Sequence, residues 1–412
     1  MTEKDIARQL FECAAEAGNS EHKRAYLIRL PEIVLGLAAD IAAGRYQPQR
    51  FTVFAVTDPK LREIFAPAFP DRLVQQWLVR HIEPWFDKRF IDDSYANRKG
   101  KGTHAAVTKL QQFMRQPKHR WYCKLDIQAF FPNIDRRILL NFWQEAQPKL
   151  PFKHEVLTLI NQVATTIINQ SPVNPPPRLS GDRALLAKIP PHKSLYHAPH
   201  GIGLPIGSLT SQFFANVYLN ELDQYIKHTL KIQGYLRYVD DFIILGDNAE
   251  LLIAQQKQIA QFLQDKLHLQ LHPHKIVLQR VNQGADYLGS IVYPHHSLIR
   301  QRSVRALHRR LYFFRQLLAS NGQTKTRALP NGTWQRWLNN HTAFITPGVP
   351  TPELLQRMLA TINSYYGLFI HARTYTLRKH IYHRRLGTLQ TYFLPANKDY
   401  THLRVRKIWI NT

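Results

Sequence analysis

The sequence predicts an α+β fold, in which an antiparallel sheet is backed by helices. Short apolar runs bounded by Gly, Pro and Asp predict strands that follow each other as hairpins, which makes them antiparallel. Longer segments whose apolar residues recur every three or four positions predict the helices. With 412 residues, 44% of them hydrophobic, the chain has room for two or three domains with cores of their own.

The charge of the chain is strongly one-sided. It has 55 Lys and Arg residues against 29 Asp and Glu, a formal net charge of +26. An excess of this size predicts a polyanionic partner, and we favour nucleic acid over a membrane surface because no run of about 18 apolar residues could span a bilayer. We find no signal peptide, and Cys13 and Cys123 have no disulfide or metal-ligand spacing. We therefore expect a reduced, cytoplasmic protein without a membrane partner.

The N-terminal part is predicted to be helical and then to form a hairpin. Residues 5–44 have helical apolar spacing, and residues 51–65 predict a β-hairpin with its turn at Asp58-Pro59. Lys60 and Arg62 lie beside that turn, where basic side chains can clamp a triphosphate. Taken alone, they fit a solvated turn better.

A second amphipathic helix begins at Asp71, and a basic loop follows over residues 90–104. The later half of the loop is rich in Gly, Lys and Arg, so its backbone can approach phosphates closely. Arg98 and Lys99 are the candidate nucleic-acid contacts there. A flexible surface loop explains the same residues equally well, and the sequence leaves both readings open.

Three acidic residues are attached to predicted strands. The strand 121–126 ends in Asp126, and a later hairpin, 234–246, has Asp240 and Asp241 at its tip. Adjacent carboxylates repel each other and are costly to bury uncompensated. A divalent cation is the simplest compensation, and Mg²⁺ favours a few carboxylates together with substrate phosphates. An acidic turn is the alternative for an isolated Asp-Asp pair.

Between these acids the chain is predicted to be helical over 141–170 and irregular over the Pro-rich segment 171–201. A Gly/Pro loop then opens a helix, which Ser208 or Thr210 can cap. Small residues in this loop let a flat substrate lie against the backbone, although a glycine-rich helix entry is the plain alternative. We expect Asp135 to be a turn or helix N-cap residue, not a further metal ligand.

The remainder of the chain is predicted to begin with strands and to end with basic helices. One helix, from about residue 300, has an apolar stripe and a cationic face that includes Arg305 and Arg309. Such a helix can pack on a core and follow a phosphate backbone, with a solvated basic face as the alternative. The other expected elements are a helix at 249–268, a strand at 276–279, a hairpin at 286–293 and a helix at 352–370.

In this order, the motifs resemble those of prokaryotic reverse transcriptases. The similar segments are 59–64 and 71–75 in the fingers, then 125–131, 204–212, 238–241, Lys275 and 287–289 in the palm. The likeness covers about residues 25–295 and implies a right-hand polymerase. We expect N-terminal helices and fingers at 1–120, and a palm at 121–295 with a fingers or loop insertion at 136–205. A basic helical thumb and C-terminal extension would follow at 296–412.

The resemblance implies an RNA-directed DNA polymerase that makes cDNA by two-metal nucleotidyl transfer. Asp126, Asp240 and Asp241, assisted by the Ile127 carbonyl, would hold two Mg²⁺ ions, or Mn²⁺ in their place. The residues implied for dNTP binding are Lys60 and Arg62 at the triphosphate, Phe131 excluding a 2′-hydroxyl, Ile206 and Gly207 beside the nucleotide, and Lys275 as proton donor to pyrophosphate. Those implied for template RNA and cDNA are Arg98, Lys99, Tyr287, Leu288, Gly289, Arg305 and Arg309.

One position departs from many relatives of this kind. Retroviral, retron and group II intron enzymes usually have Gln between the Pro and Gly of the second motif, where this chain has Ile206. The form is most similar to reverse transcriptases of diversity-generating retroelements, which copy RNA with frequent errors opposite adenine. Ile cannot donate the amide hydrogen bonds of Gln, so we expect reduced fidelity. That likeness also implies a noncoding RNA and a small basic accessory protein as partners.

Two alternatives to this function remain open at the level of sequence. Antiphage-defence reverse transcriptases are near relatives that share the same core, and some make DNA by protein-primed or template-independent synthesis. A non-catalytic RNA-binding scaffold is the other alternative, and the presence of Asp126, Asp240 and Asp241 argues against it.

Overall fold

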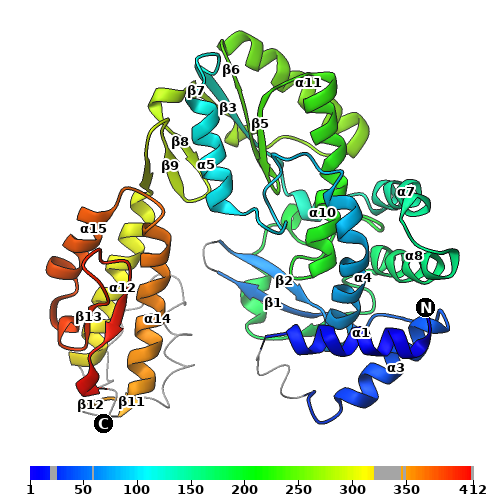
Figure 1. Ribbon diagram of the computed structural model, residues 1–412, viewed down its shortest axis with the longest axis horizontal. Helices are drawn as coiled ribbons and strands as arrows, with labels where there is room; N and C mark the ends of the chain where they lie inside the picture. The colour runs from blue at the N-terminus through cyan, green and yellow to red at the C-terminus, as the bar shows by residue number, and fades with distance from the viewer. Residues whose placement is uncertain (19–25, 58–59, 320–344, 347–348, 410–412) are drawn as a thin grey trace. The chain divides into compact units, whose positions relative to one another are not determined.

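The computed structural model describes residues 1–18, 26–57, 60–319, 345–346 and 349–409 (Figure 1). The chain forms two compact units, the first comprising Met1–Ala106 and Trp121–Gln279 and the second Val107–Arg120 and Arg280–Thr412. Each unit combines helices with antiparallel strands, which confirms the predicted α+β class. In the described part of the chain, no helix combines the length and the apolar character needed to cross a membrane.

The helices of the first unit largely follow the predicted apolar spacing. Instead of one helical stretch over 5–44 there are two helices, and residues 19–25 between them lie outside the described residues. Asp135 caps a helix as expected, because its side chain accepts a hydrogen bond of 2.9 Å from the Arg137 N–H. The helices are α1 (Glu3–Glu16), α3 (Leu30–Ala42), α4 (Phe69–Asp87), α5 (Thr103–Met114, continuing into the second unit), α6 (Phe130–Asn133), α7 (Arg136–Ala146), α8 (His154–Asn169), α9 (Arg183–Leu186), α10 (Leu209–Gln224) and α11 (Ala249–Leu267).

The central sheet of the first unit has the strand order β5-β6-β3-β7 (Figure 1). Its strands are β3 (Trp121–Asp126), β5 (Gly234–Tyr238), β6 (Asp241–Gly246) and β7 (Val277–Arg280). Strand β6 runs antiparallel to both β5 and β3, and α11 packs against β3 and β6. Phe242, Ile243 and Ile244 are consecutive and fully buried, so both faces of β6 are covered.

The predicted fingers hairpin is present as β1 (Thr52–Val56) and β2 (Arg62–Ala66). The expected turn residues, Asp58 and Pro59, lie outside the described residues. Beside β1 lies the short parallel strand β4 (Arg178–Leu179), which belongs to the Pro-rich and otherwise irregular segment. Glu63 ties this segment to β2, because the buried carboxylate accepts hydrogen bonds from the Ser194 hydroxyl at 2.9 Å and from the Leu195 N–H.

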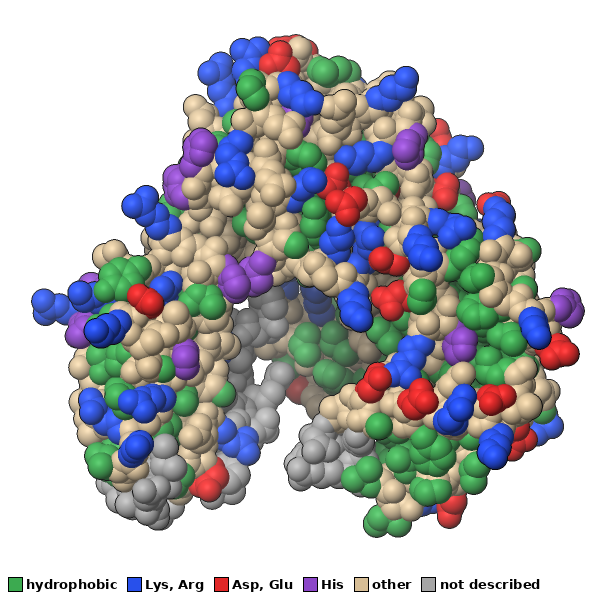
Figure 2. Space-filling view, viewed as in Figure 1, with side chains coloured by type: hydrophobic (Ala, Val, Ile, Leu, Met, Phe, Trp, Pro, Cys, Tyr) green, Lys and Arg blue, Asp and Glu red, His purple; other side chains and the backbone are tan. Residues whose placement is uncertain are grey.

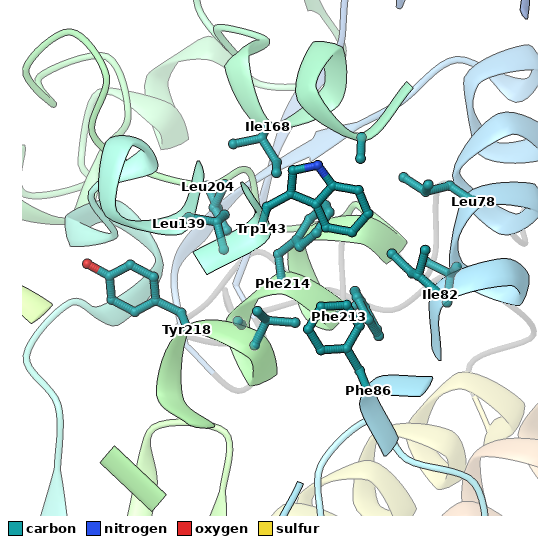
Figure 3. Packing of buried hydrophobic residues seen from close by; sticks show 14 of the residues in the cluster. Leu78, Ile82, Phe86, Leu139, Trp143, Ile168, Leu204, Phe213, Phe214 and Tyr218 are labelled. Atoms are coloured by element: carbon teal, nitrogen blue, oxygen red, sulfur yellow. The ribbon is translucent and has the colours of Figure 1, made fainter. Parts of the chain in front are cut away.

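Aromatic side chains fill the core of the first unit (Figure 3). Trp143 of α7 is fully buried, and its ring centre lies 6.4 Å from Phe86 of α4 and 6.3 Å from Phe214 of α10. The indole N–H donates to Asn161 at 2.9 Å, so its polar group is satisfied within the core. This packing joins α4, α7 and α10 into one core, and the loop that enters α10 is attached to it.

The second unit has a core of its own, built on α12 and α14. As predicted, Val304, Leu307 and Leu311 of α12 are buried, while Arg305 and Arg309 are exposed. A small hairpin near the C-terminus, formed by β13 and β14, was not predicted. The elements are β8 (Ala285–Tyr287), β9 (Ser290–Val292), β10 (Ser297–Ile299), α12 (Gln301–Ala319), β11 (Ile345–Thr346), β12 (Val349–Pro350), α14 (Pro352–Phe369), α15 (Tyr375–His380), β13 (Phe393–Pro395) and β14 (Leu403–Val405).

Candidate active site

The central sheet brings the three predicted acidic residues together. Strands β3 and β6 pair so that Asp126 lies opposite Asp241, and the Ile127 N–H donates to the Asp240 carbonyl at 3.1 Å. Paired Cα atoms in an antiparallel ladder are roughly 4.5–5.5 Å apart. Residues distant in sequence therefore form one carboxylate cluster at one end of β3 and β6.

The cluster includes a strained two-residue turn. Tyr238 pairs with Asp241, so Val239 and Asp240 form the turn of the β5–β6 hairpin. Val239 has φ +55°, a left-handed conformation that is unfavourable for a β-branched residue. Two contacts hold the turn: the Arg237 guanidinium donates to the Val239 carbonyl at 3.0 Å, and Ile127 binds the Asp240 carbonyl.

Arg237 itself is fully buried and belongs to a polar network beneath the turn. It forms a 2.6 Å ion pair with the buried Asp223 of α10, and it also bonds to Asn216 at 3.2 Å and to Ser94 at 3.2 Å. The Tyr235 hydroxyl completes the network with a 2.6 Å hydrogen bond to Asp223. The sequence analysis did not identify this network, although a charged residue within an otherwise apolar strand signals a buried partner.

Burial strongly perturbs the acids of the hairpin. Burial and, to a smaller extent, the nearby Asp126 carboxylate together raise the pKa of Asp240 to about 6. Burial also raises the pKa of Asp241 to about 6, although the Lys124 ammonium opposes the shift. Oδ1 of Asp241 is buried and has no hydrogen-bond partner in the described part of the chain. An orphaned carboxylate oxygen in an electron-rich cluster suits an additional cation.

Two lysines partly neutralise the cluster. Nζ of Lys275 lies 2.5 Å from Oδ1 of Asp126, and Nζ of Lys124 lies 3.1 Å from Oδ2 of Asp241. Lys275 was a sequence candidate, whereas Lys124 was missed. The signal for Lys124 is its position two residues before Asp126, which puts both side chains on one face of β3. Within the described ranges, no three His, Cys, Asp or Glu side chains form a ready-made metal cage, so a cation here would also need substrate oxygens.

The loop before α10 joins the fingers hairpin to the first acidic motif. The Phe65 N–H donates to the Ile206 carbonyl at 2.8 Å, and the Leu204 N–H donates to the Phe131 carbonyl at 2.8 Å. Gly207 has φ +117°, and a Cβ there would lie 2.9 Å from the Phe65 carbonyl oxygen. Ile206 and Gly207 thus lie against β2, the strand that carries Arg62, and Phe131 is tied to the same loop through Leu204.

The expected caps of α10 are wrong. Ser208 occupies the N-cap position, but neither its side chain nor that of Thr210 caps the helix. The Ser208 hydroxyl instead donates to Oε1 of Gln75 at 2.9 Å and lies 3.0 Å from the Thr210 hydroxyl. The buried amide of Gln75 competes for the hydroxyl, so these residues tie α10 to α4.

The remaining candidates of the first unit differ in how exposed their side chains are. Lys60 and Arg62 are exposed, and the Arg62 charge lowers the pKa of Asp240. Lys99 is also exposed. The Arg98 side chain, however, is only 7% exposed, pairs with Asp87 at 2.6 Å and donates to backbone carbonyls, so it holds the loop together in this structure.

The candidates of the second unit lie on a hairpin and on a helix. Leu288 and Gly289 form the turn of β8–β9, with φ +45° and +97°, and the adjacent Tyr287 is fully buried. Arg305 and Arg309 lie on the exposed face of α12. The turn and the helix face therefore offer surface contacts, whereas Tyr287 supports the hairpin from inside.

Comparison with known proteins identifies a family and several relatives of this chain. A family model described as reverse transcriptase (RNA-dependent DNA polymerase) matches residues 57–292. Protein YkfC of Escherichia coli (strain K12) is 23% identical over 305 residues, covering 65% of this chain and 71% of that protein. The group II intron-encoded protein LtrA of Lactococcus lactis subsp. cremoris is 21% identical over 311 residues, covering 60% of this chain and 47% of LtrA. The chain thus spans about half the length of LtrA.

A solved structure of telomerase from Candida albicans, in complex with a fragment of telomeric RNA, is also similar. Its TM-score is 0.42 at 12% sequence identity, and the match covers 84% of this chain and 60% of the telomerase chain.

Proposed function

The chain belongs to the reverse transcriptase (RNA-dependent DNA polymerase) family, and from this premise we propose that it copies an RNA template into cDNA by two-metal nucleotidyl transfer. The observation that carries the proposal is the pairing of Asp126 with Asp241 beside Asp240. The predicted enzyme class and right-hand polymerase fold agree with the family match. We also propose the division expected from sequence, with fingers at 1–120, a palm at 121–295 containing the insertion 136–205, and a thumb from 296.

The carboxylate cluster fits divalent cations that are shared with substrate. Burial and the proximity of the carboxylates raise the pKa values of Asp240 and Asp241, and Oδ1 of Asp241 has no hydrogen-bond partner among the described residues, so a bound cation would stabilise the charged forms. We assign Asp126, Asp240 and Asp241, with the Ile127 carbonyl, to hold two Mg²⁺ or Mn²⁺ ions. When bound, such ions activate the attacking hydroxyl and stabilise the leaving phosphate. Lys124 orients Asp241, and Lys275 exchanges its contact with Asp126 for the departing pyrophosphate.

The neighbouring elements would bind the incoming dNTP and the nucleic acid. Arg62 and Lys60 would contact the triphosphate, while Phe131 limits the space at the sugar 2′-position. For the template–primer we propose Lys99, the Leu288-Gly289 turn supported by Tyr287, Arg305 and Arg309, whereas Arg98 acts through the loop that it holds. On the face shown in Figure 2, Lys and Arg side chains are spread widely, in keeping with the formal net charge of +26, which attracts a polyanion.

Primer extension tests this function and separates it from the alternatives. We expect the full chain to extend a primer on an RNA template with dNTPs and Mg²⁺. DNA made without added template, or attached to the protein, would favour the antiphage-type synthesis instead. RNA binding without synthesis under any condition would leave the scaffold function and contradict our proposal.

At a finer level, we propose that Ile206 lowers fidelity, as in reverse transcriptases of diversity-generating retroelements. The Ile206 carbonyl anchors the loop to Phe65, which leaves its side chain to vary without loss of the loop. An aliphatic side chain offers no hydrogen bond to the nucleotide. We expect Ile206→Gln to reduce misincorporation, most of all opposite adenine, when products are sequenced. An unchanged error spectrum would contradict the assignment, together with the noncoding RNA and basic accessory protein that it implies as partners.

A further inference from the structure

The first unit has a cavity at the end of the β1–β2 hairpin away from its turn. The cavity has a volume of about 390 Å³, and its lining includes Thr52 and Ala66. These residues pair at one end of the β1–β2 ladder, whereas Val56 and Arg62 pair at the other end. Four residues of strand separate the two ends by roughly 13 Å at about 3.3 Å per residue. The cavity is therefore distinct from the triphosphate contact assigned to Arg62.

The lining of the cavity is cationic and has no acidic member. Arg50, Arg72 and Arg178 contribute to it from three segments of the chain. None of the three side chains has an ion pair with a described residue, and the buried Nε of Arg72 has no hydrogen-bond partner among them. Guanidinium groups that are both clustered and unpaired favour an anion, and their planar donors match phosphate oxygens especially well.

Aromatic rings form another part of the wall. Tyr26 stacks on Phe69, with ring centres 5.3 Å apart and planes at 25°. The Arg72 guanidinium lies 5.3 Å from the centre of the Phe69 ring. Phe69 is buried, so the half-buried Tyr26 ring is the member of this stack that a planar ligand can reach, and every nucleobase has a face that can stack on such a ring.

We propose that this cavity binds one nucleotide of a single-stranded RNA, with its phosphate on the arginines and its base against the aromatic wall. The volume lies within the range of small-ligand sites, roughly 300–1,000 Å³. Free nucleotides share this chemistry, and we favour RNA because the open side and the exposed Arg50 allow a chain to continue beyond the cavity. The inference rests on the proposed function only in taking RNA as the ligand.

A charge-matched pair of variants tests the site. The double variant Arg72→Gln/Arg178→Gln removes two charges from the cavity, and Arg8→Gln/Arg89→Gln removes two from exposed positions elsewhere in the first unit. Binding of a short 5′-labelled single-stranded RNA to each full chain is measured by fluorescence anisotropy at near-physiological salt. We expect the cavity variant to bind about tenfold more weakly and the control to change by less than about twofold. Equal losses would overturn the proposal, because they would report bulk charge alone.

Two further probes separate the possible sources of the ligand. Tyr26→Leu leaves the charge unchanged and is expected to weaken single-stranded RNA binding about threefold or more, with little change for a blunt RNA duplex. A similar loss for both RNAs would overturn a single-strand site. AMP at millimolar concentration is expected not to displace the RNA, and displacement would reassign the cavity to free nucleotides.

The binding assay is independent of polymerisation. The same contrast between the variants is expected in the background Asp240→Asn, in which extension is blocked. If the wild-type chain fails to extend a primer but the contrast persists, the proposed function fails while this site stands. Thermal unfolding confirms that each variant is folded, and a folded cavity variant with unchanged RNA affinity refutes the site.

Discussion

The hairpins β5–β6 and β8–β9 both close with a two-residue turn, but they differ in what holds the turn. In β8–β9, Leu288 and Gly289 have φ +45° and +97°, and glycine occupies the second turn position. In β5–β6, the left-handed residue is the β-branched Val239. Glycine adopts positive φ at little cost, whereas a β-branched residue does so only where its surroundings enforce it.

The difference between the hairpins shows where the protein keeps strain. The Val239 turn is enforced by Arg237 below it and by Ile127 beside it, and it presents Asp240 to the carboxylate cluster. In the β8–β9 turn only Leu288 is in an unfavourable left-handed conformation, and it is not β-branched, while Gly289 adopts positive φ at little cost. Strained backbone persists only where neighbouring contacts over-determine it, and such sites are often functional.

The strongest test of the comparison is Asp240→Asn, which changes the acid in the strained turn. We expect primer extension to fall by at least about a hundredfold, because a neutral amide cannot hold a divalent cation as a carboxylate does. The control is Asp247→Asn, which alters an exposed acid just beyond β6 and should leave extension near wild type. Near-normal extension by Asp240→Asn would show that the strained turn does not serve catalysis.

The support beneath the turn is tested by Arg237→Met. Removing one partner of a buried ion pair should destabilise the protein by about 3–5 kcal/mol, because the Asp223 carboxylate would remain buried and unpaired. Urea unfolding followed by circular dichroism measures this loss, and Arg305→Met on the exposed face of α12 is the control. The double variant Arg237→Met/Asp223→Leu should recover much of the lost stability. A loss below about 1 kcal/mol for Arg237→Met would show that the clamp is unimportant.

The pH dependence of the free energy of unfolding tests the raised pKa of Asp240 in the β5–β6 hairpin. The folded pKa of Asp240, about 6, lies above its usual value of 3.8, so the folded state binds more protons between these values. Without added metal, stability should therefore rise as pH falls from 7 to about 4, by about 1–3 kcal/mol for this group.

Thermal unfolding from pH 7 to pH 5 measures the stability effect. Asp71 and Asp241 also have pKa values raised to about 6 by burial, so the informative quantity is the difference between wild type and Asp240→Asn. Equal pH slopes for the two proteins would contradict the assignment of the raised pKa to Asp240.

The smallest expected effects come from replacing the left-handed residue in each of the two turns. Val239→Gly should change stability by no more than about 1 kcal/mol, because relief of the left-handed conformation offsets the added entropy of the unfolded chain. Gly289→Ala should instead lower the free energy of unfolding by about 1 kcal/mol. Its φ of +97° suits glycine, and no atom lies close enough to an added Cβ to offset the strain with a new contact. Val239→Gly should also slow extension, because the acid is held less firmly. If both variants lose the same stability, the two turns do not differ in strain.

The sequence alone was sufficient to predict the strands that carry Asp126, Asp240 and Asp241, the buried stripe of α12 and the N-cap role of Asp135. Each of these depends on residues close together in the chain, because helix and strand periods are set locally. The enzyme class followed from the order of the motifs and agrees with the family match.

Only the tertiary structure decided which charges meet. It paired Lys124 with Asp241, Arg237 with Asp223, and Arg98 with Asp87, and it left the three arginines that line the cavity beside β1 and β2 without an ion pair among the described residues. A sequence shows that a buried charge requires a partner, but the choice among many candidates depends on how distant segments pack. Helix and strand periods are therefore readable from neighbours in the chain, whereas the electrostatics of the sites exist only once the fold has brought remote residues together.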